Sequence, residues 1–291
     1  MPIVVKNVSH TYMPGTPFES LAVDDVSFTV NDGEFLGIIG HTGSGKSTLI
    51  QHLNGLIKPD KGSVSIDGMD IAPASAEAKA ARRRVGLVFQ YPEYQLFEET
   101  VLKDISFGPL NLGLSEEEAH KRAEEAAILV GLGKERLDKS PFDLSGGMKR
   151  RCAIAGVLAM DPDYLILDEP AAGLDPSGRR GMESLLRTLH TEKRKTLVMV
   201  SHSMEDVAKL CDRIIVMRSG RIFLEGAPAE IFRRRDLLAD AGLDLPAAQV
   251  LADKLREKGF IIPEGIYDSV MLAHLCAEQI HARREAGMHA E

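Results

Sequence analysis

Short, continuous hydrophobic runs are the most regular feature of this sequence. Four of them, at residues 35–39, 85–89, 164–167 and 196–200, have the length of strands and are bounded by turn residues or polar residues. Such runs are typical of strands that are buried on both faces of a sheet. Helical patterns lie between them along the chain, and the alternation predicts an α/β fold.

The segments before the first run have a different pattern. Residues 3–8 and 21–30 predict antiparallel strands, with a turn-rich loop at 10–20 and a hairpin-like turn at 31–33. A further short strand is predicted at 63–66. We therefore expect an N-terminal antiparallel β-subdomain.

Two helical regions complete the pattern. Residues 100–107 and 114–130 predict helices, the first broken by Gly108-Pro109, so that about 91–144 is a helical subdomain. After a predicted hairpin at 213–217 and 221–225, three helices are expected at 231–238, 246–258 and 267–282. The chain thus divides into a unit at 1–228 and a C-terminal helical appendage at 229–291, which we expect to serve in packing or dimer contact.

Composition narrows the class of protein. The 291 residues are 44% hydrophobic and 27% charged, which is ordinary for a globular protein, and the net charge of −8 argues mildly against nucleic acid as the main partner. Three scattered cysteines indicate a reducing compartment, and no apolar run approaches the roughly 20 residues that span a bilayer. The basic run at 82–84 is either a solvated helix end or a phosphate or nucleic-acid patch.

The strongest chemical motif follows the run at 35–39. A glycine, four residues and Gly-Lys-Ser stand between a strand and a helix, which is the spacing of a phosphate-binding loop. Glycines let the loop bend and bring its amides close to a polyphosphate, the lysine reaches the β- and γ-phosphates, and the serine ligates Mg²⁺. The candidate nucleotide-binding residues are Gly40, Gly43, Ser44, Gly45, Lys46, Ser47 and Thr48.

Polar residues at the ends of the other buried strands are the next candidates. Asp168 and Glu169 end the strand at 164–167, and His202 follows the strand at 196–200. In an open α/β sheet such positions lie where ligands bind. Asp168 suits Mg²⁺ ligation, Glu169 suits deprotonation of an attacking water, and His202 suits a contact with the γ-phosphate.

Two further features bear on a nucleotide. Tyr12, in the turn-rich loop, either stacks on a base or covers the edge of the sheet. The sequence Leu-Ser-Gly-Gly opens a helix that runs to residue 160; there Ser145 can cap the helix, and Gly146 and Gly147 leave its amides open to an anion.

In this order, the phosphate loop, Gln90, the Leu-Ser-Gly-Gly sequence, Asp168-Glu169-Pro170 and His202 resemble the nucleotide-binding subunit of an ATP-binding cassette (ABC) transporter. The resemblance covers about residues 3–227. Phe89-Gln90-Tyr91-Pro92-Glu93-Tyr94-Gln95-Leu96-Phe97, with the C-terminal helices, is similar in particular to the ATPases of energy-coupling factor (ECF) transporters, which take up vitamins and metal ions.

The resemblance implies a P-loop NTPase core and a head-to-tail dimer with two ATP molecules between the subunits. Each ATP is held by one subunit's phosphate loop and the other's signature, here Ser145, Gly146 and Gly147. Tyr12 would stack on adenine, and Ser47, Gln90 and Asp168 would be the Mg²⁺ partners. Glu169, His202 and Gln90 would be the catalytic residues.

The resemblance also implies the partners. These are a second ABC ATPase, an integral membrane coupling subunit that meets the loop at 91–97, and a substrate-binding membrane subunit, all at the cytoplasmic face of the cell membrane. The signature of the family usually ends in Gln, whereas Met148 occupies that place here. Met lacks the polar contacts of Gln, so an unlike ATPase partner is plausible, and a homodimer stays open.

Two other classes remain open from sequence. Cassette ATPases of DNA repair or translation usually carry a long coiled-coil insertion or two cassettes, and this chain shows neither pattern. A nucleotide-binding subunit without catalysis would be expected to lack Glu169 or His202, and both are present.

Overall fold

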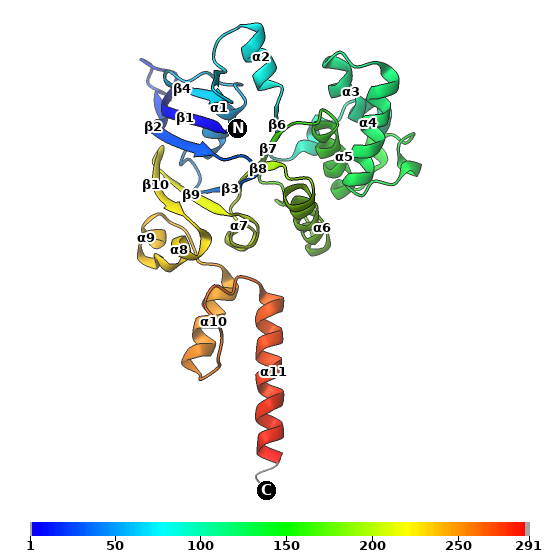
Figure 1. The fold of residues 1–291 in the computed structure, drawn as a ribbon. Helices are drawn as coiled ribbons and strands as arrows, with labels where there is room; N and C mark the ends of the chain where they lie inside the picture. Colours follow the sequence, from blue (N-terminus) through cyan, green and yellow to red (C-terminus); the bar gives the residue numbers. More distant parts are fainter. Residues whose placement is uncertain (1, 289–291) are drawn as a thin grey trace.

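The computed structural model describes residues 2–288, so Met1 of the predicted unit 1–228 and residues 289–291 of the unit 229–291 lie outside the described residues. The described strands form two sheets (Figure 1). In chain order they are β1 Ile3–Tyr12, β2 Ser20–Val30, β3 Phe35–Ile39, β4 Lys61–Ile66, β5 Met69–Asp70, β6 Val85–Val88, β7 Tyr164–Asp168, β8 Thr196–Val200, β9 Arg213–Arg218 and β10 Arg221–Gly226.

The larger sheet forms the centre of the molecule. Its strand order is β10-β9-β3-β8-β7-β6, in which neighbours are parallel except for the antiparallel hairpin of β9 and β10. Every residue of β3, β7 and β8 is buried. Along β3, Phe35 and Ile39 join one large apolar cluster and Leu36 and Ile38 join the other, so both faces of the sheet are covered. The predicted α/β core is confirmed.

The smaller sheet is antiparallel, with the order β2-β1-β4-β5, and confirms the N-terminal β-subdomain. Two details of the prediction are wrong. β1 extends into the expected loop at 10–20 as far as Tyr12, because Thr11 and Tyr12 pair with Leu21 and Ser20 of β2, and the loop itself is shorter, at 13–19. The turn at 31–33 joins no hairpin, since β2 and β3 belong to different sheets.

Helices surround the larger sheet and form the helical subdomain. The helices before the appendage are α1 Lys46–Leu53, α2 Ala76–Arg82, α3 Val101–Asn111, α4 Glu116–Leu129, α5 Gly146–Leu158, α6 Pro176–Arg187 and α7 Met204–Leu210. Shorter helical turns occur at Pro92–Gln95, Lys134–Arg136, Pro141–Asp143 and Thr188–Glu192. α3, α4 and α5 pack together at one side of the sheet (Figure 1).

The predicted break at Gly108-Pro109 is wrong, because α3 continues through both residues to Asn111. Gly108 faces the end of α5 so closely that a Cβ there would lie 2.8 Å from Cγ of Met160. Pro109, the next residue, is also buried. Packing against α5 therefore offsets the hydrogen bond that Pro109 cannot donate.

The C-terminal appendage contains α8 Pro228–Arg233, α9 Arg235–Asp240, α10 Ala247–Glu257 and α11 Ser269–Met288. The helix expected at 231–238 is two helices, because Arg234 leaves the helical conformation, with φ −86° and ψ 58°. Phe232 and Leu238 pack into the large core, whereas α10 and α11 have a small apolar cluster of their own. Together α10 and α11 form a narrow stem that projects from the body (Figure 1).

Candidate active site

The phosphate-binding motif is a tight loop between β3 and α1. Gly40, Gly43 and Gly45 have positive φ angles of 155°, 79° and 100°. A Cβ at Gly45 would lie 2.2 Å from the carbonyl oxygen of Ala22, so only glycine fits there. Ser44 is fully buried beneath the loop, and its carbonyl accepts a hydrogen bond from the Gly220 amide.

Lys46 lies inside this loop. Its Nζ donates to the carbonyl oxygens of Gly40 and His41 at 2.7 and 2.9 Å, and only 6% of the residue is exposed. Burial lowers the pKa of Lys46, and the charges of Glu169 and Asp168 oppose that shift. The ammonium is thus held at the centre of the loop, facing two carboxylates.

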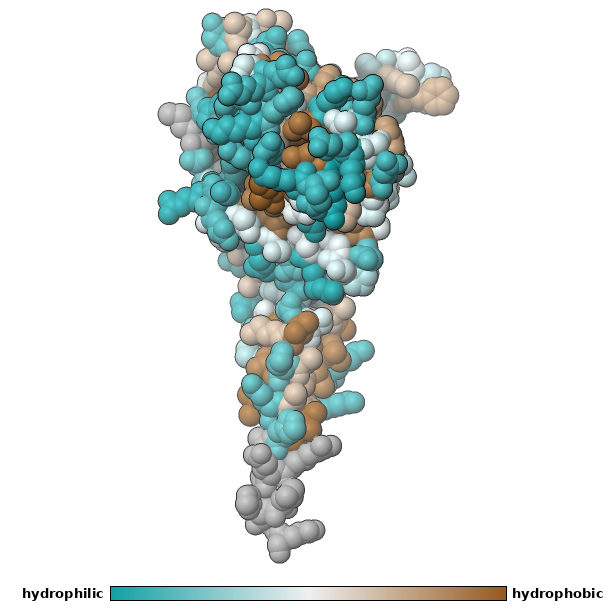
Figure 2. Space-filling view, turned by 90° about the vertical axis from the view of Figure 1, so that its right-hand side faces the viewer, coloured by the Kyte–Doolittle hydropathy of each residue, from teal (hydrophilic) through white to brown (hydrophobic). Residues whose placement is uncertain are grey.

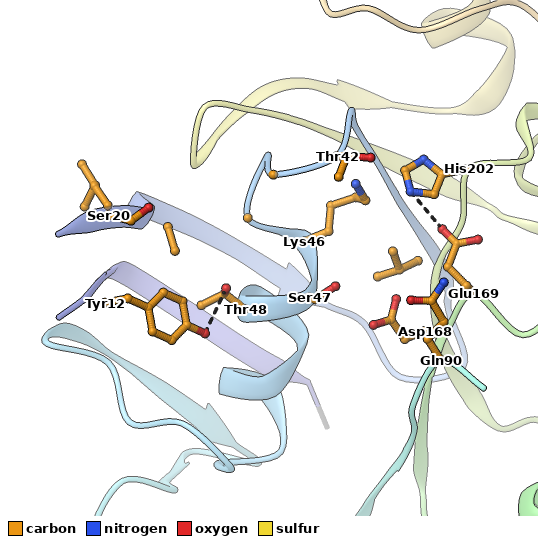
Figure 3. A pocket seen from close by; sticks show the side chains of 15 residues that line it. Tyr12, Ser20, Thr42, Lys46, Ser47, Thr48, Gln90, Asp168, Glu169 and His202 are labelled. Carbon is orange, nitrogen blue, oxygen red and sulfur yellow. Dashed lines mark hydrogen bonds and ion pairs between the residues drawn. The ribbon is translucent and has the colours of Figure 1, made fainter. Parts of the chain in front are cut away.

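The two carboxylates come from the end of β7, beside the ends of β6 and β8. Since these strands are parallel, Gln90, Glu169 and His202 meet at one edge of the sheet. Asp168 is 8% exposed, and burial raises its pKa, although the Ser47 hydroxyl and the Lys46 charge favour the ionised form. Figure 3 shows Asp168 and Ser47 on facing sides of the site.

Glu169 has the environment of a proton acceptor. Burial raises its pKa to about 7, and the charges of Asp168 and Asp206 add to the effect. Its Oε1 lies 3.5 Å from Nε2 of His202 (Figure 3). A carboxylate with a pKa near neutrality can take a proton from water and release it again at physiological pH.

Tyr12 lies at the opposite end of the site. Its hydroxyl is 3.3 Å from Oγ1 of Thr48, its ring packs edge-on against His10, and 40% of the residue is exposed. The exposed ring is available to stack on a planar base.

These residues line one cavity of about 360 Å³ (Figure 3). Among the candidate residues from the sequence, its lining includes Tyr12, Gly43, Gly45, Lys46, Ser47, Thr48, Gln90, Asp168, Glu169 and His202. Gly40 and Ser44, in the loop beneath, and the signature residues Ser145, Gly146 and Gly147 are not part of this lining.

Sequence reasoning missed several lining residues. Ser20, Leu21 and Ala22 reach the cavity because β2 pairs with the end of β1, and Val200 lies at the end of β8. Thr42 also lines the cavity, and its place inside the phosphate-binding motif was a signal that could have found it.

Comparison with known proteins identifies this arrangement. The ABC transporter family model matches residues 23–172. The energy-coupling factor transporter ATP-binding protein EcfA2 of Clostridium perfringens (strain 13 / Type A) is 56% identical over 268 residues, which cover 92% of this chain and 94% of the relative. The chain belongs to the energy-coupling factor ATP-binding proteins of the ABC transporter family.

Other members of this family and solved cassettes are also similar. The EcfA2 protein of Symbiobacterium thermophilum is 55% identical, over 91% of this chain and 92% of its own. The structure of cbiO1 from Clostridium perfringens, described as part of the ABC transporter complex cbiONQ, has a TM-score of 0.72 and 37% identity, covering 86% of this chain and 98% of its own. The dimeric cassette MJ0796 bound to ADP and Pi has a TM-score of 0.69 and 33% identity, covering 78% of this chain and 98% of its own.

The signature of this energy-coupling factor ATPase lies at the start of α5. Ser145 occupies the N-cap position of α5, but its side chain makes no capping hydrogen bond, and a Cβ on Gly146 or Gly147 would meet no atom within 4 Å. Ser145 and Gly146 are exposed, whereas Met148 is half-buried against the large core. An open helix start of this kind is suited to receive an anion from outside the chain.

The basic run of the ATPase at 82–84 is neither a fully solvated helix end nor a patch of three available cations. Arg82 donates to the carbonyl oxygens of Ile71 and Pro73. Arg84 forms ion pairs with Asp67 and Asp163. Two of its three guanidinium groups therefore serve the fold.

Proposed function

We propose that this chain is the ATP-hydrolysing subunit of an ECF-type importer, which couples ATP binding and hydrolysis to the uptake of a vitamin or a metal ion. The observation that carries the proposal is the single cavity in which Lys46, Asp168, Glu169 and His202 converge opposite Tyr12. Adenine stacks on Tyr12, and the phosphates lie along the loop toward Lys46.

The residues present fit a magnesium ion. Ser47, Gln90 and Asp168 offer a hydroxyl, an amide oxygen and a carboxylate, the hard oxygen ligands that Mg²⁺ prefers alongside phosphate oxygens. The described residues contain no group of three or more His, Cys, Asp or Glu side chains that could hold a metal ion without such help. Mg²⁺ would neutralise charge on the β- and γ-phosphates.

Glu169 carries the proton transfer. Its carboxylate takes a proton from a water molecule while the water oxygen bonds to the γ-phosphorus and the bond from that phosphorus to the ADP oxygen breaks. His202, 3.5 Å from Glu169, fixes the carboxylate and reaches the γ-phosphate. Lys46 stabilises the negative charge that the transferred group carries.

We infer that the site is completed by a second ATPase subunit. The exposed signature of this chain would bind the ATP of that subunit, whose own signature would close over Lys46. The stem supports the contact, because it exposes apolar side chains, among them Ile261, Val270, Met271 and Ile280 (Figure 2). Met148 stands where the signature of the family usually has Gln, and it lacks the polar contacts of Gln. This substitution favours a partner ATPase that differs from this chain.

We also infer that the chain works at the cytoplasmic face of a membrane, bound to integral membrane coupling and substrate-binding subunits. The described residues contain no helix that is both long enough and apolar enough to cross a bilayer. The segment 91–97 offers a docking surface, since Tyr94 is 85% and Phe97 57% exposed.

The test is Glu169→Gln in the complete transporter, with the partner ATPase's hydrolytic site silenced by its own mutation. Gln keeps the shape of the side chain but cannot accept the water proton, so ATP turnover should fall at least about 100-fold while MgATP still binds. Phosphate release and nucleotide binding are measured side by side. Full turnover in this variant would refute the role of Glu169.

A further inference from the structure

Arg150 joins three segments that are distant in the sequence. It lies on α5, five residues after Ser145, and only 3% of its side chain is exposed. Its guanidinium donates to both carboxylate oxygens of Glu93, with Nε–Oε2 and Nη2–Oε1 distances of 3.0 and 2.7 Å. It also donates to the main-chain carbonyls of Pro170 and Ala172.

The segment that carries Glu93 is held firmly against this cation. Cζ of Arg150 lies 5.7 Å from the centre of the Tyr91 ring, a distance typical of a cation–π contact. Tyr91 has a left-handed φ of 53°, which a tyrosine keeps only where its surroundings fix it. Arg150 supplies such surroundings through its contacts with Tyr91 and Glu93.

The surroundings of Glu93 favour its ionised form. Burial by itself would raise the pKa of Glu93, but the hydrogen bonds from Arg150 and from the Glu93 amide hold that pKa below its usual value. Buried ion pairs add little net stability, yet removing one partner leaves an uncompensated charge. The pair is therefore better suited to fixing geometry than to stabilising the fold.

Each of the three segments belongs to a different part of the ATPase. The segment 91–97 follows Gln90 and exposes aromatic side chains. Pro170 and Ala172 are the first and third residues after Glu169, so a contact with their carbonyls holds the loop that follows the proton acceptor. α5 begins at the signature, which faces another subunit in the proposed dimer.

We propose that the Glu93–Arg150 pair couples the docking of the membrane subunit on segment 91–97 to Glu169 of the same chain and to the signature end of α5. The proposal rests on the proposed function. Both are positioning residues: a shift of the docked segment moves the guanidinium, and with it the loop after Glu169 and the start of α5. Without the pair, docking no longer changes the rate of hydrolysis.

The experiment compares two preparations of the same ATPase pair: one alone, and one in the complete transporter in lipid nanodiscs. kcat and KM for MgATP are measured in both. In the wild type the kcat of the two preparations should differ about fivefold or more. Glu93→Gln keeps the shape of the side chain and removes its charge. In this variant the ratio of kcat in the transporter to kcat in the ATPase pair alone should fall to within about twofold of one, with KM nearly unchanged.

Glu118→Gln is the matched control. It removes a half-exposed ion pair with Arg122 on α4 of the same subdomain, so it should keep the wild-type ratio. Arg150→Lys is the second variant in case Glu93→Gln folds poorly. Lysine keeps the charge but cannot serve Glu93 and both carbonyls at once, so it should also bring the ratio toward one.

The outcomes separate the possibilities. A wild-type ratio in folded Glu93→Gln and Arg150→Lys overturns the coupling role, and so does a parallel loss of kcat in both preparations, which is the sign of a purely structural role. A ratio of one in the wild type itself would refute the proposed transport function, and the coupling would fall with it.

Discussion

At the scale of single residues, Glu169 combines two unfavourable conditions. It has a left-handed φ of 51°, and its carboxyl is buried beside Asp168. Each condition costs free energy unless the surroundings over-determine it. The hydrogen bond of its amide to Val200 and the proximity of His202 hold it in place. The protein thus keeps a strained, proton-binding carboxylate where the proposed reaction uses one.

This predicts a pH dependence of stability. Because the folded pKa of Glu169, about 7, lies above its ordinary value of 4.5, the folded state binds this proton more tightly than the unfolded state. The contribution is full below about pH 4.5 and is lost as the pH rises through about 7. Urea denaturation of the wild type and Glu169→Gln, without nucleotide or magnesium, gives the free energy of unfolding of each protein. The difference between the two free energies should change across this pH range.

The sign of that difference is fixed. Between about pH 5 and about pH 8 the wild type should lose stability relative to Glu169→Gln, because only the wild type must ionise a buried carboxyl. Parallel curves would mean that the pKa of Glu169 is not raised.

Residues in contiguous motifs were predictable from sequence, and residues brought in by pairing were not. The glycines of the phosphate loop and Asp168-Glu169 can be recognised by their spacing and by the strands that precede them. Ser20 reaches the cavity only because β1 extends far enough to pair with it. Glu93 and Arg150 are 57 positions apart, and no local pattern joins them.

At the scale of elements, two helix starts differ in what their capping serine does. The hydroxyl of Ser115 accepts a hydrogen bond from the Glu118 amide at 3.3 Å at the start of α4. Ser145, at the start of α5, makes no such bond. The first serine therefore serves its own helix, and the second has its hydroxyl available for a ligand.

Substitution of each serine by alanine should separate these roles. Ser115→Ala should lower the free energy of unfolding by about 1 kcal/mol and leave ATP turnover of the complete transporter unchanged. Ser145→Ala should change stability by less than about 0.5 kcal/mol and reduce turnover. Denaturant titration and phosphate release measure the two effects, and a stability loss in Ser145→Ala equal to that of Ser115→Ala would contradict the assignment.

The elements that sequence misjudged share a cause. Thr11 and Tyr12 look like loop residues but gain backbone partners on β2, and Gly108-Pro109 looks like a helix end but packs on α5. In each case tertiary contacts outweigh a local preference. The buried strands were predictable because a short continuous hydrophobic run is itself the pattern of a strand that is buried on both faces.

At the scale of the whole molecule, the stem is separate from the ATP cavity. α10 and α11 have their own apolar cluster, built on Ala252, Ile262, Ile266 and Leu272, and none of their residues lines the cavity. If the stem contacts a second subunit, as proposed above, that contact can change without changing the nucleotide site. The domain boundaries themselves stay predictions.

Replacing Met271 and Ile280 by Glu should weaken the ATPase pair. Both side chains are exposed on α11, so the fold should tolerate the change, while a buried apolar contact with the partner would not. The dissociation constant of the pair should rise at least about tenfold, with nucleotide affinity unchanged. Analytical ultracentrifugation measures it, with Glu278→Gln on the same helix as the control; an unchanged constant would remove the stem from the interface.

The signature of this chain does not line the cavity that contains Lys46, and this separation has a genetic consequence. In the proposed head-to-tail pair, a mutation at Lys46 and a mutation in the partner's signature disable the same ATP-binding site. The double mutant should then be no worse than either single mutant. Mutations at Lys46 and Ser145 of this one chain disable both ATP-binding sites. The loss of activity in the double mutant should therefore exceed that in either single mutant. Epistasis between alleles would thus follow the composite sites rather than the boundaries of the genes.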